Sequence, residues 1–163
     1  MSTLDAVRLP AAKQIRDLLS RLVEPEVTLR PSTPFAVGPH YRASLATYVD
    51  AHLVVRAVVA LDLPLSIPLG AARTLLPRSV VRAAISAQAA PPRVARGVED
   101  VLRAAAPLLA TGPDAALRVH SLSVAGERLP ELDRARTQCL GRREDLAVTV
   151  AGYGSGRLAI LIT

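Results

Sequence analysis

The sequence predicts an α+β fold in which a mixed or antiparallel sheet of about six strands has its helices packed mainly on one face. Two observations predict it. Apolar residues follow a helical spacing in three segments, and β-branched apolar segments occur in adjacent pairs, as antiparallel hairpins do. The chain has 163 residues, of which 50% are hydrophobic, so it is long enough to bury one sizeable core. We therefore predict a single domain over residues 1–163.

The first element is an amphipathic helix over residues 11–23. Its apolar positions Ile15, Leu18, Leu19 and Leu22 recur at i, i+3, i+4 and i+7, and Pro25 ends it. A short strand over 27–29 follows. The proline-rich segment 31–40 is predicted to be an irregular loop.

A pair of strands is expected within residues 41–61. Between 42 and 49 the apolar positions alternate with a more polar set that includes Ser44 and Tyr48, which indicates a strand with one buried face. The run 53–61 is β-branched and nearly continuous, as in a central strand buried on both faces. Residues 50–52 are short enough to close a hairpin.

Helical spacing returns over residues 68–88, with an interruption at Pro77. Ser66 and Ser79 are the candidate N-caps of the two helical pieces. A longer helix is expected over 93–111, and the residues 111–114 are expected to stop it. The polar face of this long helix carries four charged residues that form two i, i+4 pairs, Arg96 with Asp100 and Glu99 with Arg103.

The carboxyl-terminal third should supply the remaining strands, at 116–124, 145–151 and 157–162, with one short helix around 131–138. The glycine-rich run 152–156 lies between the last two strands. A phosphate-binding loop requires a helix after the glycines, so we interpret this run as a hairpin turn.

The formal charge of +6 raises the question of nucleic-acid binding. Lys13 is the only lysine among 20 basic residues, and the arginines are scattered along the chain between acidic residues, as at Arg142-Arg143-Glu144-Asp145. Only four aromatic residues are present to stack on bases. Nucleic acid is therefore an unlikely partner.

The remaining composition favours a cytoplasmic protein without membrane segments. Cys139 is the only cysteine, which excludes an internal disulfide, and we interpret it as a buried small hydrophobe. The start of the chain lacks the apolar run of a secretory signal, and no apolar stretch is long and uninterrupted enough to cross a bilayer. The histidines His40, His52 and His120 have no metal-site spacing, so we expect ordinary histidines, no metal and no cofactor.

The order of these elements, from the helix at 11–23 to the strand at 157–162, resembles the CheC/CheX family of chemotaxis phosphatases and their relatives among the flagellar switch phosphatases. The resemblance implies a CheX-like fold for most of the chain. In that family the long helix carries an acidic residue and, three positions later, an asparagine; the pair enters the active site of a phosphorylated response regulator and positions the hydrolytic water. Here Asp100 falls at the acidic position and Arg103 at the asparagine position, and the register from Glu99 gives Leu102 instead.

The chain contains no asparagine, and an arginine lacks the paired donor and acceptor of a carboxamide. The resemblance thus implies a divergent member that is not an enzyme. We expect a noncatalytic protein-interaction domain in signalling or motility, which binds a receiver-domain response regulator or a second copy of itself through Arg96, Glu99, Asp100 and Arg103. Two alternatives remain: a residual phosphatase that uses Glu99 or Asp100 with Arg103, and a nucleic-acid-binding module.

Overall fold

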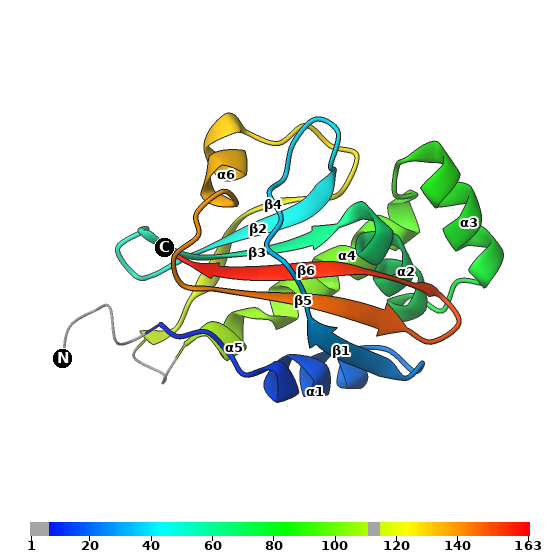
Figure 1. Cartoon of the computed structure of the whole chain (residues 1–163), viewed down its shortest axis with the longest axis horizontal. Coiled ribbons are helices and arrows are strands. Elements are labelled where there is room, and N and C mark those ends of the chain that lie inside the picture. The colour runs from blue at the N-terminus through cyan, green and yellow to red at the C-terminus, as the bar shows by residue number, and fades with distance from the viewer. Residues whose placement is uncertain (1–6, 111–114) are drawn as a thin grey trace.

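The computed structural model describes residues 7–110 and 115–163, and its centre is one six-stranded sheet in the order β1-β5-β6-β3-β2-β4, with every neighbouring pair antiparallel (Figure 1). The strands are β1 Val27–Pro31, β2 Ala43–Val49, β3 Val55–Asp62, β4 Arg118–Ser123, β5 Arg143–Val150 and β6 Gly154–Ile162. The helices are α1 Ala12–Leu22, α2 Leu63–Arg73, α3 Arg78–Ala87, α4 Pro92–Ala104, α5 Ala106–Leu109 and α6 Glu131–Arg136. The predicted α+β fold class is confirmed.

The sheet is covered on both faces. One face packs against α1, α2 and α4 through side chains such as Tyr48, Val59 and Ile160, and it holds the larger core. The opposite face is covered by the segment between β1 and β2, whose Phe35 and Val37 form a smaller apolar cluster with alternate residues of β2, β3 and β6. Helices therefore lie mainly on one face, and the proline-rich loop predicted at 31–40 serves as the second covering layer.

The covering of both faces corrects the interpretation of β2 as a strand with one buried face. Every residue of β2 is buried, and Ser44 and Tyr48, which were placed in its polar set, are completely inaccessible to solvent. The hydroxyl of Tyr48 donates a hydrogen bond to the backbone carbonyl of Leu102 on α4. A polar side chain in a buried strand here marks a hydrogen bond between layers and not a solvent-facing position.

The two predicted helix caps at Ser66 and Ser79 are wrong. α2 begins at Leu63 because Asp62 accepts a hydrogen bond from the backbone N–H of Leu65 at 3.0 Å, which is the interaction of an N-cap. Ser66 lies inside that helix and bonds the hydroxyl of Ser44 on β2 at 2.8 Å. α3 begins at Arg78 with Pro77 as its N-cap, so Ser79 also lies within the helix.

The long helix predicted over 93–111 is divided. α4 ends at Ala104, and the four-residue α5 follows after Ala105. The division has a local cause, because Pro107 has no backbone N–H to donate to the carbonyl of Arg103, which interrupts the helical hydrogen bonds at this point. The predicted stop at 111–114 lies outside the described residues.

The connection between β2 and β3 is longer than predicted. Leu53 has a positive φ of 61° and is 59% exposed, and β3 begins only at Val55. The carboxylate of Asp50 organises this turn by accepting hydrogen bonds from the backbone N–H groups of His52 and Val54 and from the side chain of Arg56. The predicted carboxyl-terminal hairpin forms, but its turn is shorter than predicted, because β5 ends at Val150 and β6 already begins at its partner Gly154.

The helices α2 and α4 cross at unusually close range. A Cβ atom built on Gly97 of α4 would collide with the backbone carbonyl of Gly70 on α2, and a Cβ on Gly70 would collide with the carbonyl of Val94. Only glycine at both positions permits this approach. The crossing sets the height of α4 above the sheet and thereby positions its outer face.

Candidate functional site

The charged residues predicted to bind a partner all lie on α4. Arg96, Asp100 and Arg103 are exposed, Glu99 is half-buried, and the opposite side of the helix buries Val94, Val98, Val101 and Leu102 against the core. The 3.6-residue period places the four charged residues along one outward side of α4. The structure thus brings the predicted site residues together on one accessible surface, which we call the α4 face.

The ion pairs on the α4 face differ from those predicted. Among the described residues, neither the Arg96–Asp100 nor the Glu99–Arg103 pair is formed, and the carboxylate of Asp100 lies 3.5 Å from the Nε of Arg73 at the end of α2. The side chains of Arg73 and Asp100 are 38% and 53% exposed, so this contact contributes little to stability. It does link the α4 face to the end of α2.

The helices around the α4 face carry most of the net positive charge of the chain. Residues 63–110 contain only two carboxylates, Glu99 and Asp100, and six arginines, so this segment carries +4 of the total of +6. All six arginines are exposed, and they lie on or between α2, α3 and α4, which pack together. They are Arg73, Arg78, Arg82, Arg93, Arg96 and Arg103. The segment that forms these helices is thus already rich in arginine, folding exposes all six on neighbouring helices, and the surface favours an acidic partner.

A second candidate site is a polar pocket beside the start of β2, close to the end of α3, where Arg42 bonds the carbonyl of Gln88. It has a volume of about 540 Å³ and lies between residues 37–43, which lead into β2, and residues 126–134, which include the start of α6. Three arginines line it, Arg42, Arg128 and Arg134, together with Glu127 and Glu131. We call this hollow the arginine pocket.

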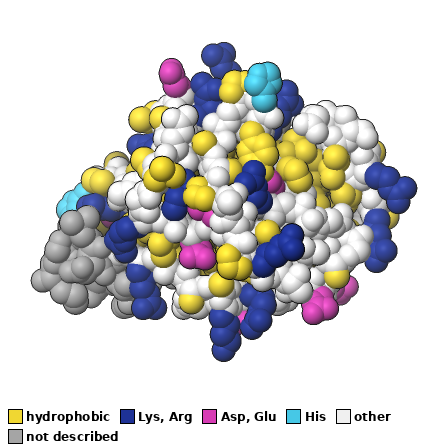
Figure 2. Space-filling view, viewed as in Figure 1, with side chains coloured by type: hydrophobic (Ala, Val, Ile, Leu, Met, Phe, Trp, Pro, Cys, Tyr) yellow, Lys and Arg dark blue, Asp and Glu magenta, His cyan; other side chains and the backbone are white. Residues whose placement is uncertain are grey.

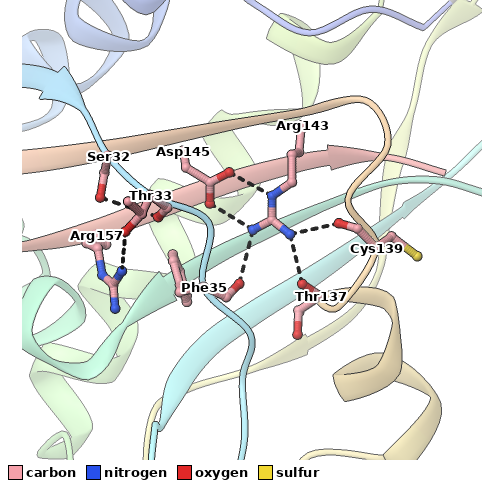
Figure 3. Close-up of polar contacts among 8 residues, drawn as sticks. All are labelled: Ser32, Thr33, Phe35, Thr137, Cys139, Arg143, Asp145 and Arg157. Atoms are coloured by element: carbon pink, nitrogen blue, oxygen red, sulfur yellow. Dashed lines mark hydrogen bonds and ion pairs between the residues drawn. The ribbon is translucent and has the colours of Figure 1, made fainter.

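The walls of the arginine pocket are held together by Arg143 of β5 (Figure 3). Its guanidinium forms two hydrogen bonds to the carboxylate of Asp145, at 2.6 and 2.7 Å, and also donates to the backbone carbonyls of Phe35, Thr137 and Cys139 at 2.8 to 3.0 Å. All five N–H groups of the side chain are thereby used. A further bond, from the backbone N–H of Val37 to the hydroxyl of Thr137 at 2.9 Å, joins the same two segments.

A third polar cluster surrounds the buried carboxylate of Asp62. It accepts hydrogen bonds from the hydroxyl of Tyr41 at 2.6 Å and from the backbone N–H of Arg157 at 2.9 Å, in addition to its bond with α2. The Arg157 guanidinium lies 5.1 Å from the ring centre of Phe35 and 5.0 Å from that of Tyr41, within cation–π range. Burial, and then the hydrogen bond to Asp62, raise the pKa of Tyr41 to about 12. This phenol is a neutral donor that ties the covering segment to the sheet.

The isolated reactive residues do not converge on a site. Cys139 is exposed, so the interpretation of it as a buried hydrophobe is wrong. His40, His52 and His120 are also exposed, and within the described ranges no three metal-ligating side chains come close enough together to hold an ion. Over residues 7–110 and 115–163, no helix is both apolar and long enough to cross a bilayer.

Sequence patterns indicated the α4 face but not the arginine pocket. The α4 face could be predicted directly, because the apolar period of the long amphipathic helix separates its buried side from its exposed side. The pocket is assembled from two segments that are distant in the chain, and neither of them carries a motif. The one local signal was the closeness of Arg143 to Asp145, which we interpreted only as a basic pair of residues followed by an acidic pair.

Comparisons with known proteins identify the fold. No protein-family model matches the chain, and no curated protein matches it in sequence. CheX in the crystal structure of the CheX–CheY–BeF3–magnesium complex from Borrelia burgdorferi matches with a TM-score of 0.52 and 12% identity, over 95% of this chain and 99% of that chain. FliM in the FliM–SpeE complex from H. pylori matches with a TM-score of 0.51 and 11% identity, over 91% of this chain and 77% of that chain. The FliM middle domain of Vibrio alginolyticus matches with a TM-score of 0.50 and 14% identity, over 99% of this chain and 93% of that chain.

At these identities the likeness establishes the fold alone. The chain has the architecture shared by CheX and the middle domain of FliM, which confirms the CheX-like fold predicted from the order of its elements. Both of those proteins belong to chemotaxis or the flagellar switch, and the CheX and H. pylori FliM structures are complexes with another protein.

Proposed function

We propose that this chain is a noncatalytic protein-interaction domain in signalling or motility, which binds a receiver-domain protein through the α4 face. The observation that carries the proposal is the concentration of exposed arginines on α2, α3 and α4, with Arg96 and Arg103 at its centre on α4. An acidic or phosphorylated protein surface complements this charge, since a phosphoryl group adds between one and two negative charges and accepts hydrogen bonds from arginine.

The fold supports the choice of partner. CheX, which shares the architecture, was crystallised with CheY in the presence of BeF3 and magnesium. The α4 face also has the right shape for docking, because it is a continuous helix surface with its charged side chains exposed and its apolar side chains buried. A docked partner therefore meets charge and hydrogen-bonding groups and no large apolar patch.

The same surface gives no support to a residual phosphatase. The carboxylate of Asp100 lies against Arg73, and the residue three positions later is Arg103, which has no acceptor atom. A positioned water needs both a proton acceptor and an oriented donor. We therefore propose binding without hydrolysis, with Arg96 and Arg103 as the attractive residues and Glu99 and Asp100 as residues that fix the orientation.

The proposal is tested by affinity capture from a lysate of the source cells, followed by mass spectrometry. The wild type is compared with Arg96→Glu/Arg103→Glu and with the matched charge reversal Arg30→Glu on the edge strand β1, which is also exposed. A receiver-domain protein captured by the wild type and by Arg30→Glu, and lost with the double variant, is the expected result. Equal capture of it by all three proteins would contradict docking through α4.

A purified capture partner then permits the hydrolysis test. Its phosphorylated form should lose phosphate at the same rate with and without this domain. Accelerated loss that depends on Asp100 would refute the noncatalytic part of the proposal and leave the docking part intact. A short DNA duplex added as a competitor should not displace the partner at physiological salt, because α4 itself contains no aromatic residue and Tyr48, which contacts it, is completely buried and offers bases no stacking surface.

A further inference from the structure

The arginines of the arginine pocket form no ion pairs with carboxylates among the described residues. Of the described residues, none supplies a carboxylate that forms an ion pair with Arg42, Arg128 or Arg134, although Glu127 and Glu131 line the same hollow. Arg42 donates one N–H to the backbone carbonyl of Gln88 at 3.0 Å, which orients it and leaves the rest of its donors for another group. Three guanidinium groups therefore surround one open volume without being neutralised by the described protein.

Arg134 carries a hydrogen-bond donor that lacks a partner in the described part of the chain. Its Nε is buried and has no hydrogen-bond acceptor among the described residues. A buried donor without an acceptor is unfavourable, and native structures contain few of them. The solvent-inaccessible Nε is also closed to a ligand, so a bound anion would contact the terminal N–H groups of Arg134, which lines the pocket.

We propose that the arginine pocket binds a small anion with several phosphate or carboxylate oxygens, held between Arg42, Arg128 and Arg134. The planar guanidinium fork matches the paired oxygens of both groups. The volume of about 540 Å³ falls within the usual range for small-molecule sites. Apolar side chains of Val37, Ala43 and Leu129 line part of the wall and can contact the uncharged portion of such a ligand.

The surrounding protein prepares the pocket for this role. Arg143 fixes the segment 35–37 to the end of α6 through its three carbonyl contacts, so the two walls keep their separation before a ligand arrives. In Figure 2 basic side chains gather at the top of the view, over the region where Figure 1 places α6 and the loop that enters β2. No residue of α4 lines the pocket, so the proposal does not depend on receiver docking.

The carboxylates of Glu127 and Glu131 should limit how tightly the arginine pocket binds an anion. Their carboxylates repel an anion that approaches them, so affinity should depend on the balance between the arginines and the glutamates. Replacing Glu131, which is exposed, by glutamine removes repulsion while keeping a similar shape. This substitution should strengthen binding, which separates the proposal from a general loss of structure that only weakens it.

The test is a calorimetric titration with pyrophosphate and, separately, with citrate. We expect saturable one-to-one binding of at least one of them to the wild type, about tenfold weaker binding to Arg128→Ala and Arg134→Met, and tighter binding to Glu131→Gln. Arg82→Ala on α3 removes the same charge elsewhere on the surface and should leave the affinity unchanged. Circular dichroism of each variant checks that it is folded.

Each outcome decides a part of the proposal. Binding of pyrophosphate alone identifies a phosphate site, and binding of citrate alone identifies a carboxylate site. No saturable binding of either probe to the wild type would overturn the proposal. An equal loss with Arg82→Ala and Arg128→Ala would also overturn it, because diffuse surface charge and not the pocket would then hold the anion.

Discussion

The buried ion pair between Arg143 and Asp145 gives the sharpest prediction of stability. The two side chains are only 6% and 4% exposed, and they share two hydrogen bonds of 2.6 and 2.7 Å. Replacing Asp145 by alanine leaves a buried guanidinium with two unpaired N–H groups. The loss of one partner from such a pair costs about 3–5 kcal/mol. At about 2–4 °C per kcal/mol for a domain of this size, the melting temperature should fall by roughly 6–20 °C.

The assay is thermal unfolding followed by circular dichroism, supported by urea unfolding at constant temperature. Asp17→Ala serves as a matched control, because Asp17 is paired with Arg16 at 3.9 Å and both side chains are about half exposed. That change should cost less than about 0.5 kcal/mol. The double variant Arg143→Met/Asp145→Leu should be no less stable than Arg143→Met alone, since Asp145 without its partner would be a buried unpaired carboxylate. A cost below about 1 kcal/mol for Asp145→Ala would refute the burial and bonding assigned to this pair.

Two further predictions concern the packing of the helical layer and of the covering segment. Gly97→Ala should destabilise the domain by about 1–3 kcal/mol despite the better helix propensity of alanine, because the new Cβ meets the carbonyl of Gly70. Gly141 has open space around it, so the control Gly141→Ala should be nearly neutral; urea unfolding measures both. Tyr41 has a folded-state pKa raised from 10.0 to about 12, so its contribution to stability is complete below pH 10 and is lost as the pH rises through about 12. The unfolding free energy of the wild type should therefore fall more steeply over that interval than the unfolding free energy of Tyr41→Phe; parallel curves would contradict the raised pKa that burial and the bond to Asp62 give Tyr41.

The order and type of the elements could be predicted from the sequence because periodicity reports which side of an element is buried. The helix predicted at 11–23 and the carboxyl-terminal hairpin both depend on local patterns; the helix was predicted close to its observed bounds, and the hairpin was predicted with a turn that is too long. The division of the long helix at Ala105 was missed, although Pro107 supplied the signal, because the apolar spacing continues across it.

What could not be predicted depends on contacts between distant segments. Tyr48 looked polar in its strand because nothing in the sequence shows that α4 would offer it the carbonyl of Leu102. Asp62 was not predicted as the helix cap because Ser66 and two prolines, Pro64 and Pro68, follow it closely. Its other partners, Tyr41 and Arg157, are far away in the chain. The α4 face was predicted as a set of residues, but the contact of Asp100 with Arg73 and the packing of three arginine-bearing helices side by side could be seen only in the fold.

The measurement that tests the central claim most directly is a titration of a purified receiver-domain protein, captured as described above, with this domain. It should be carried out with and without BeF3 and magnesium to mimic the phosphorylated state. We predict that binding is tighter in the activated state, weakens about tenfold or more with Arg96→Glu/Arg103→Glu, and is unchanged with Arg30→Glu. Equal affinity of the wild type and the double variant for the activated receiver would show that the α4 face is not the docking surface.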